Sequence, residues 1–199
     1  VRGNKIGKSM YELTGIERGD RPDIIAGSYE DVIKEGAADV VIIATDSYTR
    51  TSFDKIKYCL ERKINVISTA EEMAYPQAQS PELAKELDRI AKENGVTVLG
   101  TGINPGLIMD LLVIVLTGAC IEVESIKAER INNLSPFGPS VMHGQGVGIS
   151  VEEFNRRVEE NDLDGHIGFP ESITMIADAL GWKLSDEIKL ERAPIVSKV

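Results

Sequence analysis

The stretch "ADVVIIAT", residues 38–45, decides the fold. It is a continuous run of β-branched and small apolar residues, which is typical of a strand buried on both faces of a parallel sheet. Two similar runs follow, "INVIST" at 64–69 and "VTVLGT" at 96–101. Each predicts a further strand, and a weaker strand-then-helix pattern precedes them at 23–36.

Helical patterns lie between and after these strands. Residues 49–63 carry apolar side chains at helical spacing, and residues 80–95 begin with Ser-Pro and end at a glycine, the usual signals of a helix start and stop. Residues 105–118 predict a third helix. Strands that alternate with helices over short connections specify a parallel sheet with right-handed crossovers. We therefore predict an α/β fold, a parallel sheet with helices on both faces.

The pattern changes near residue 120. Residues 121–133 alternate apolar and polar side chains with period two, as an antiparallel strand with one solvated face does. Residues 135–148 are rich in glycine and proline and predict a loop. Two amphipathic helices are expected after it, at 150–161 and 170–182. We therefore predict two domains, an α/β domain over 1–120 and an α+β domain over 121–199.

Composition restricts the partners and the compartment. The chain has 199 residues, with 22 basic and 32 acidic side chains and a net charge of −10, which argues against nucleic acid or an anionic membrane as partner. Cys59 and Cys120 make no disulfide framework, and no apolar run reaches the ~20 residues of a membrane span. These observations predict a cytoplasmic protein. Because the chain opens on Val1 and ends in an extended-looking segment, we expect it to be part of a longer protein.

Three segments follow the predicted strands at the edge where open parallel sheets bind ligands: "ATDSYTR", "STAEEMAYP" and "GTGINPG". In the third, Gly100, Gly102 and Gly106 allow the backbone to pass close to a flat ligand, and Pro105 starts a helix whose free N–H groups face the same edge. Asn104 could orient an amide. The alternative is that these residues simply make a strand-to-helix turn.

Glu71 and Glu72 are two adjacent carboxylates directly after a strand. Loop glutamates are usually solvated, which is the simpler interpretation. At this edge, however, a partly buried pair would hold one proton more tightly than a free carboxylate does, which suits proton transfer and the attraction of a cationic amine.

The two histidines lie in the second predicted domain. His143 and His166 have no HxxxH or HxH spacing and no neighbouring cysteine, so we expect no metal site. Glycines flank each of them, which fits a loop that lines a substrate pocket. A structural or merely exposed histidine is the alternative interpretation.

The motifs together resemble a known family. "DVVIIAT", "NVISTAEEMAYP" and "GTGINPG", followed by "HGQGVG" and "GHIGFPESITMIADALGWKL", are similar to the 2,4-diaminopentanoate dehydrogenase family. That family belongs to the dihydrodipicolinate-reductase-like group, together with the native amine dehydrogenases. The resemblance implies a Rossmann-like domain that binds NAD or NADP, an α+β domain for the substrate and for a homodimer interface, and oxidative deamination of 2,4-diaminopentanoate to 2-amino-4-oxopentanoate and ammonia.

The resemblance also implies site residues. A catalytic glutamate is implied at Glu71 or Glu72, without a choice between them. Arg2, if it ends the family's second strand, would favour the 2′-phosphate of NADP. The backbone that would hold the cofactor comes from the strand ends: Ala44, Thr45, Ser68, Thr69, Gly102, Ile103 and Asn104.

The chain departs from the family at its start. The family's first strand and its GxGxxG turn, which bind the pyrophosphate, do not occur in these residues. Two alternatives therefore stay open. One is a reductase of the same superfamily acting on a cyclic imine, although its paired-histidine, lysine-containing motif is missing from this sequence. The other is a non-catalytic nucleotide-sensing module of the same fold.

Overall fold

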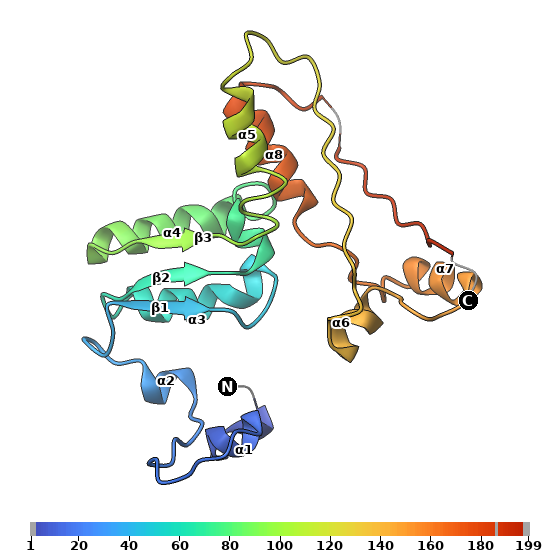
Figure 1. Ribbon diagram of the computed structural model, residues 1–199. Helices are drawn as coiled ribbons and strands as arrows, with labels where there is room; N and C mark the ends of the chain where they lie inside the picture. The colour runs from blue at the N-terminus through green and yellow to red at the C-terminus, as the bar shows by residue number, and fades with distance from the viewer. Residues whose placement is uncertain (1–2, 186, 197–199) are drawn as a thin grey trace.

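The computed structural model describes residues 3–185 and 187–196 (Figure 1). Arg2, predicted to contact the cofactor, lies outside the described residues. Three parallel strands, β1 (Val40–Ile43), β2 (Asn65–Ser68) and β3 (Val98–Gly100), pair in the order β1-β2-β3. These are the three strong strands that the sequence predicts, each shortened at its ends.

The prediction of a strand followed by a helix at 23–36 is wrong in its first half. These residues form no strand of the sheet, and Ile25 makes only an isolated antiparallel bridge with Ser9. The segment pairs locally with the chain that precedes it, where the N-terminal helices η1 (Gly3–Lys5) and α1 (Met10–Thr14) lie. Its helical half survives as the short α2 (Tyr29–Val32), which a Ser28–Asp31 capping box starts.

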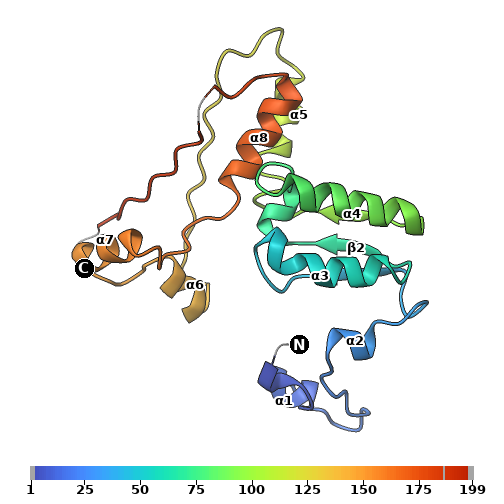
Figure 2. The same cartoon turned by 180° about the vertical axis from the view of Figure 1, so that it is seen from behind.

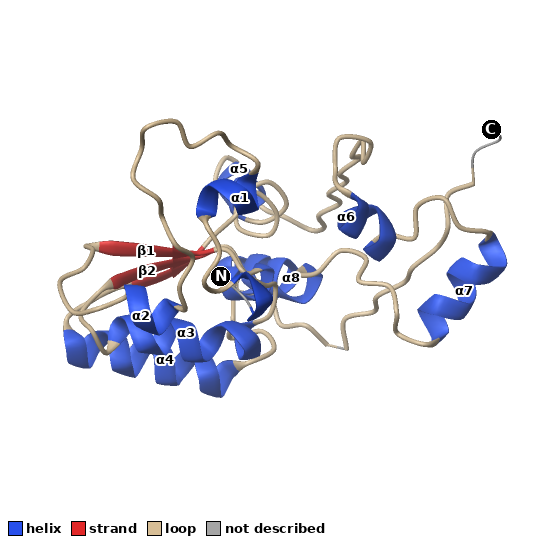
Figure 3. Cartoon of the chain, turned by 90° about the horizontal axis from the view of Figure 1, so that it is seen from below, coloured by secondary structure: helices blue, strands red, loops and turns tan. Residues whose placement is uncertain are grey.

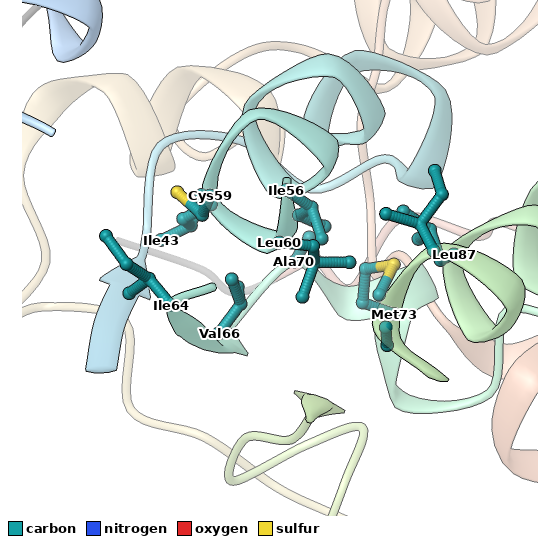
Figure 4. Close-up of a cluster of buried hydrophobic side chains, with 11 residues drawn as sticks. Ile43, Ile56, Cys59, Leu60, Ile64, Val66, Ala70, Met73 and Leu87 are labelled. Atoms are coloured by element: carbon teal, nitrogen blue, oxygen red, sulfur yellow. The ribbon is translucent and has the colours of Figure 1, made fainter. Parts of the chain in front are cut away.

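Two long helices cover one face of the sheet. Helices α3 (Thr49–Leu60) and α4 (Pro81–Asn94) lie on the same side of the strands (Figure 3). Their apolar side chains pack on Val66 of the central strand, and the largest of them have almost no exposed surface (Figure 4). The buried cluster consists of Ile43, Ile56, Cys59, Leu60, Ile64, Val66, Ala70, Met73, Leu87, Ile90 and Ala91.

The opposite face of the sheet is exposed in the described residues. Because side chains alternate along a strand, Ile42, Ile67 and Leu99 share that face, and the strand register puts them side by side. Ile42 is 66% exposed and Leu99 is 51% exposed. The predicted parallel sheet is therefore confirmed, whereas helices cover only one of its faces within residues 3–185 and 187–196.

The helix predicted at 105–118 starts later, as α5 (Leu111–Thr117), because the Asp110 side chain accepts a hydrogen bond from the Leu111 N–H at 2.6 Å and caps it there. Residues 105–110 form turns instead. Helix α8 (Phe169–Leu180), close to the prediction, folds back and packs against α5, as both views show (Figures 1 and 2).

The region between α5 and α8 differs most from the prediction. Residues 121–133 form no strand, because no described segment pairs with their backbone, and Ile121 and Ile131 are fully exposed. The predicted loop at 135–148 contains a short helix, α6 (Pro139–Gly144). Helix α7 (Val151–Glu159) forms as predicted and is capped by the Ser150 hydroxyl. No helix among the described residues is long and apolar enough to cross a membrane.

Candidate functional site

The strand ends and the C-terminal region line an open cavity of about 600 Å³. The loop after β1, the 3₁₀ turn η2 (Glu71–Ala74) after β2 and the loop after β3 each contribute to it. Of the residues predicted from sequence, four line it: Thr45, Glu71, Asn104 and His166. Others that line it come from both halves of the chain: Asp46, Ser47, Tyr48, Arg130, Asn132, Leu134, Phe137, Ser140, Val141, Gly144, Gln145, Asp164, Gly165 and Ile167.

The two adjacent glutamates have different environments. Glu71 is half-buried and lines the cavity. Glu72 points to α3 instead, where its Oε2 accepts a hydrogen bond from the Thr49 N–H at 2.7 Å. Its own N–H donates to the Ser47 carbonyl at 3.1 Å. A carboxylate at the first turn of a helix is favoured by the unpaired N–H groups and the helix dipole. Glu72 therefore anchors η2, and Glu71 is the carboxylate that faces the cavity.

Asp46 is a second carboxylate in the cavity wall. Burial raises its pKa, but hydrogen bonds from Lys55, Ser52, Thr51 and Thr45 outweigh burial and hold the pKa well below its usual range. The Lys55 ammonium lies 2.7 Å from Oδ2, and the Ser52 hydroxyl lies 2.5 Å from Oδ1. Asp46 is therefore ionised at neutral pH and fixed by the first turns of α3.

Tyr48 lies between the acidic groups. Burial raises the pKa of its phenol, and the negative charges of Asp164, Glu72 and Glu71 raise the pKa further. The phenol therefore stays protonated over the neutral range and can donate a hydrogen bond into the cavity.

Asn104 and Arg130 form a polar pair at the cavity. In the orientation that satisfies both groups, the Asn104 amide oxygen accepts from Arg130 Nη1 at 3.1 Å and from Nε at 3.2 Å. Arg130 comes from the connection at 121–133, so the C-terminal region brings a guanidinium to a loop of the sheet. A guanidinium with free N–H groups can bind a carboxylate in a bidentate way.

The two histidines have different places. His166 lines the cavity and packs edge-on against the Phe169 ring, with 4.6 Å between the ring centroids. Burial lowers its pKa, and the Arg130 charge lowers it further, so the imidazole is neutral at pH 7. His143 is not among the described residues that line the cavity. Its carbonyl accepts from Arg157 Nη1 at 3.2 Å, in a contact that ties α6 to the buried Arg157 of α7.

The glycines of "GTGINPG" are needed by the chain itself. A Cβ on Gly100 would lie 1.6 Å from the Met73 carbonyl oxygen, and one on Gly102 would lie 2.8 Å from the Pro105 carbonyl oxygen. Gly106 has φ +117°, and a Cβ there would lie 2.4 Å from the Gly102 nitrogen. Close packing of the turn therefore requires these glycines, and their role beside a cofactor stays a prediction.

The remaining strand-end residues divide by exposure. Ser68 is buried, its hydroxyl accepts from the Ala70 N–H at 3.3 Å, and its carbonyl accepts from the Thr101 N–H at 3.0 Å. These groups serve the sheet and its turn. The predicted positions that are exposed at this edge, and so accessible to a cofactor, are Ala44, Thr45, Thr69 and Ile103. No cluster of three or more metal-ligating side chains occurs in the part of the chain that the structure describes.

Comparisons with known proteins support the resemblance. Residues 107–199 match the family model of the 2,4-diaminopentanoate dehydrogenase C-terminal domain. Over all of its length the chain is 66% identical to 2,4-diaminopentanoate dehydrogenase of Acetoanaerobium sticklandii, and it covers 56% of that protein. The chain resembles 2,4-diaminopentanoate dehydrogenase.

A solved structure supports the fold. The amine dehydrogenase from Mycobacterium smegmatis is 29% identical to the chain, with a TM-score of 0.61 over 90% of the chain and 51% of that protein. The predicted resemblance and the α/β fold are thus confirmed. The chain spans about half the length of both relatives, 56% of one and 51% of the other.

The match to 2,4-diaminopentanoate dehydrogenase shows that the cavity is lined from both sides of the boundary of the matched C-terminal domain. Arg130, Asp164 and His166 belong to residues 107–199, which match its C-terminal domain, whereas Asp46 and Glu71 precede that domain. Four charged or polar residues that line the cavity were not predicted from the sequence: Asp46, Tyr48, Arg130 and Asp164. The first two lie in "ATDSYTR", which was placed at the correct edge, so a search of that segment for polar side chains could have found them. Arg130 and Asp164 carry no motif.

Proposed function

We propose that the whole protein catalyses the NAD(P)-dependent oxidative deamination of 2,4-diaminopentanoate, which yields 2-amino-4-oxopentanoate and ammonia. The observation that carries the proposal is that Glu71 lines a cavity, of mixed polar and apolar lining, at the carboxyl ends of a parallel sheet. The substrate comes from the relative that is 66% identical and from the matched family model.

The charges of the cavity suit this substrate. The substrate carries two ammonium groups and one carboxylate at neutral pH. Three carboxylates, those of Asp46, Glu71 and Asp164, line the cavity together with the Arg130 guanidinium. The acidic groups attract the ammonium groups, and Arg130 is suited to the carboxylate.

Glu71 acts as the general base in this proposal. The amine that reacts is protonated at neutral pH, with a pKa near ~10. Its nitrogen must lose a proton before the neighbouring carbon can be oxidised, and Glu71 takes that proton. Glu71 releases that proton to solvent and then takes a proton from the water whose oxygen adds to the oxidised carbon. It returns this proton to the nitrogen, so that the C–N bond breaks, ammonia leaves, and the hydroxyl proton is lost as the ketone forms. Tyr48 and the neutral His166 donate hydrogen bonds that orient the substrate.

The cofactor, NAD or NADP, accepts a hydride from the amine-bearing carbon when it is bound. The exposed strand-end residues fit its nicotinamide half, because they offer accessible backbone beside the cavity: Ala44, Thr45, Thr69 and Ile103. Thr45 and Asn104 also line the cavity itself. Ser68 and Gly102 would support the loops after the strands from inside and would not contact the nicotinamide ring.

The predicted homodimer and the cytoplasmic location stay proposals. Sedimentation of the whole protein measures its mass in solution, and we expect that of a dimer. A single species with the mass of a monomer would contradict the prediction.

The test of the function is an assay of the whole protein with 2,4-diaminopentanoate and either NAD or NADP. We expect NAD(P)H and ammonia to form in equal amounts. Ornithine, an α,δ-diamino acid without the C4 amine, is the matched control substrate and should react far more slowly. Cofactor binding without any amine oxidation would favour the non-catalytic alternative, and reduction of a cyclic imine in place of deamination would favour the reductase.

Arg130 provides a prediction about substrate recognition. Replacing it with methionine removes a charge-assisted hydrogen bond to the substrate carboxylate, which contributes about 1.5–3 kcal/mol. The KM for 2,4-diaminopentanoate should therefore rise by roughly 10- to 150-fold, with a much smaller change in kcat. Steady-state kinetics at saturating cofactor measure both constants.

The control is an amine substrate of similar length that lacks the carboxylate. Its KM should hardly change in Arg130→Met, because it has no group for the guanidinium. An equal rise in KM for both substrates would show that Arg130 supports the loop through Asn104 and does not bind the substrate.

A further inference from the structure

Glu171 is a buried carboxyl group that the proposed reaction does not use. It lies in the first turn of α8 and has no exposed surface. Its Oε1 accepts a hydrogen bond from the Gln79 side chain at 2.8 Å. Its Oε2 is also shielded from solvent and has no hydrogen-bond partner among the described residues. An ionised carboxylate in such a place is costly, because nothing among the described residues replaces the water that Oε2 loses.

Among the described residues, no positively charged side chain around Glu171 favours its charge, although the Gln79 amide, its own backbone N–H and the first turn of α8 do. No lysine, arginine or histidine in the described ranges forms an ion pair with it. The main elements that pack on α8 are η2, which carries the Glu71 and Glu72 carboxylates, and α5, whose first residue is preceded by the Asp110 carboxylate. Burial raises the pKa of Glu171 most, the hydrogen bonds from Gln79 and from its own backbone N–H lower it, and the Glu72 charge raises it again, with a net rise.

Helix α8 also holds two of the three loops that reach the cavity, the loop after β3 and the one that begins with η2. Ser172 donates to Asp110 Oδ2 at 2.9 Å, and the same carboxylate oxygen accepts from the Gly106 N–H at 2.7 Å. Gly168, just before the helix, lies so close to the Pro105 ring that a Cβ would approach it to 2.5 Å. These contacts hold the loop after β3.

The second loop, which runs from η2 to the start of α4, is held in the same way. The Glu171–Gln79 hydrogen bond lies at its end, and the Tyr75 hydroxyl donates to Asp178 Oδ2 at 2.7 Å in its middle. The Tyr75–Asp178 contact is exposed, whereas the Glu171 contact is buried. Because a buried hydrogen bond is shielded from competing water, the Glu171 contact is the stronger restraint on this loop.

We propose that Glu171 is a positioning residue that acts as an uncharged carboxylic acid, through which α8 holds the segment that carries Glu71 and Glu72. The neutral acid accepts from Gln79 with one oxygen and needs no counter-ion for the other. The segment then keeps Glu71 in the cavity wall while Glu72 stays bound to α3.

The first arm of the test is the pH dependence of the melting temperature. A carboxyl group whose pKa is raised in the folded protein stabilises the fold below its ordinary pKa, and this contribution is lost as the pH rises through the raised value. Glu171→Gln keeps the shape and is neutral at every pH. The melting temperature of the whole protein should therefore fall more steeply with rising pH, above about pH 4.3, than that of Glu171→Gln.

The matched control is the exposed Glu122, which lies outside the cavity lining. Glu122→Gln should run parallel to the parent protein over the same range. A difference in melting temperature between parent and Glu171→Gln that stays constant with pH would overturn the proposal, because the pKa of Glu171 would then not be raised in the folded protein.

The second arm measures positioning and uses the proposed deamination as its readout. Glu171→Leu fills the space but cannot accept from Gln79, so kcat should fall about tenfold, with little change in KM, while Glu171→Gln keeps most of the activity. The acidic limb of kcat/KM should not move in Glu171→Gln, since no charge is removed. Equal losses in both variants, or a parent-like kcat in Glu171→Leu, would overturn the proposal.

The two arms separate this inference from the proposed function. A parent protein that melts as expected but oxidises no amine contradicts the function, and the melting series then decides the state of Glu171. If the parent protein deaminates normally but its melting temperature differs from that of Glu171→Gln by the same amount at every pH, the inference about Glu171 is contradicted and the proposed function is not.

Discussion

Replacing Glu71 by glutamine in the whole protein is expected to lower kcat for 2,4-diaminopentanoate by roughly 10²–10⁴, the usual contribution of general acid–base catalysis. Glutamine keeps the size of the side chain in the cavity wall but cannot take a proton. The rate should be followed as NAD(P)H formation from about pH 6 to 10. In the parent protein the rate should fall at low pH as the base becomes protonated. This fall should be absent from the residual rate of Glu71→Gln.

Glu72→Gln is the matched control, one residue away in the same turn. Its side-chain oxygen can still accept the hydrogen bond from the Thr49 N–H. It loses only the favourable interaction of a negative charge with the helix start, about 0.3–1 kcal/mol, so kcat should stay within a few-fold of the parent value. A larger loss in Glu72→Gln than in Glu71→Gln would reverse the two roles, and parent-like rates in both would return the pair to a solvated loop.

Gly100→Ala should have the largest effect on stability. A single methyl group there would lie 1.6 Å from the Met73 carbonyl oxygen, which is backbone and cannot move aside alone. The strand end and η2 must separate, which we expect to cost about 3 kcal/mol. For a cooperatively unfolding unit of about 150–250 residues, that lowers the melting temperature by roughly 6–12 °C. Calorimetry or circular dichroism of the whole protein measures the shift.

Gly138→Ala serves as its control. Gly138 has an ordinary extended conformation, and a Cβ there would meet nothing within 4 Å. Its melting temperature should stay close to that of the parent. If Gly100→Ala melts at the parent temperature as well, the contact between β3 and η2 is looser than the structure indicates, and the glycine has another purpose.

Several features of the fold could be predicted from the sequence because they depend on local patterns. The β-branched runs gave strands at 40–43, 65–68 and 98–100, and Ser-Pro and glycine marked both ends of α4. The carboxyl edge of the sheet then followed from the parallel topology alone. That rule was sufficient to bring Thr45, Glu71 and Asn104 to one cavity.

Other features depended on contacts between distant parts of the chain. The alternation at 121–133 is a sound strand pattern, yet a strand forms only when a neighbour satisfies its backbone, and the described residues supply none. Arg130, within that segment, reaches the cavity through its pairing with Asn104. Nothing local distinguishes it from the other charged residues around it.

The sequence by itself determined the parallel α/β sheet, the edge at which its loops meet, and the presence of a carboxylate pair at that edge. It could not distinguish Glu71 from Glu72, because neighbouring residues of one type have the same local pattern. Only the tertiary structure separates them, since the turn of η2 directs Glu72 to the Thr49 N–H and leaves Glu71 at the cavity. The burial of Glu171 was decided in the same way, by α8 folding back over residues 92 positions earlier in the chain.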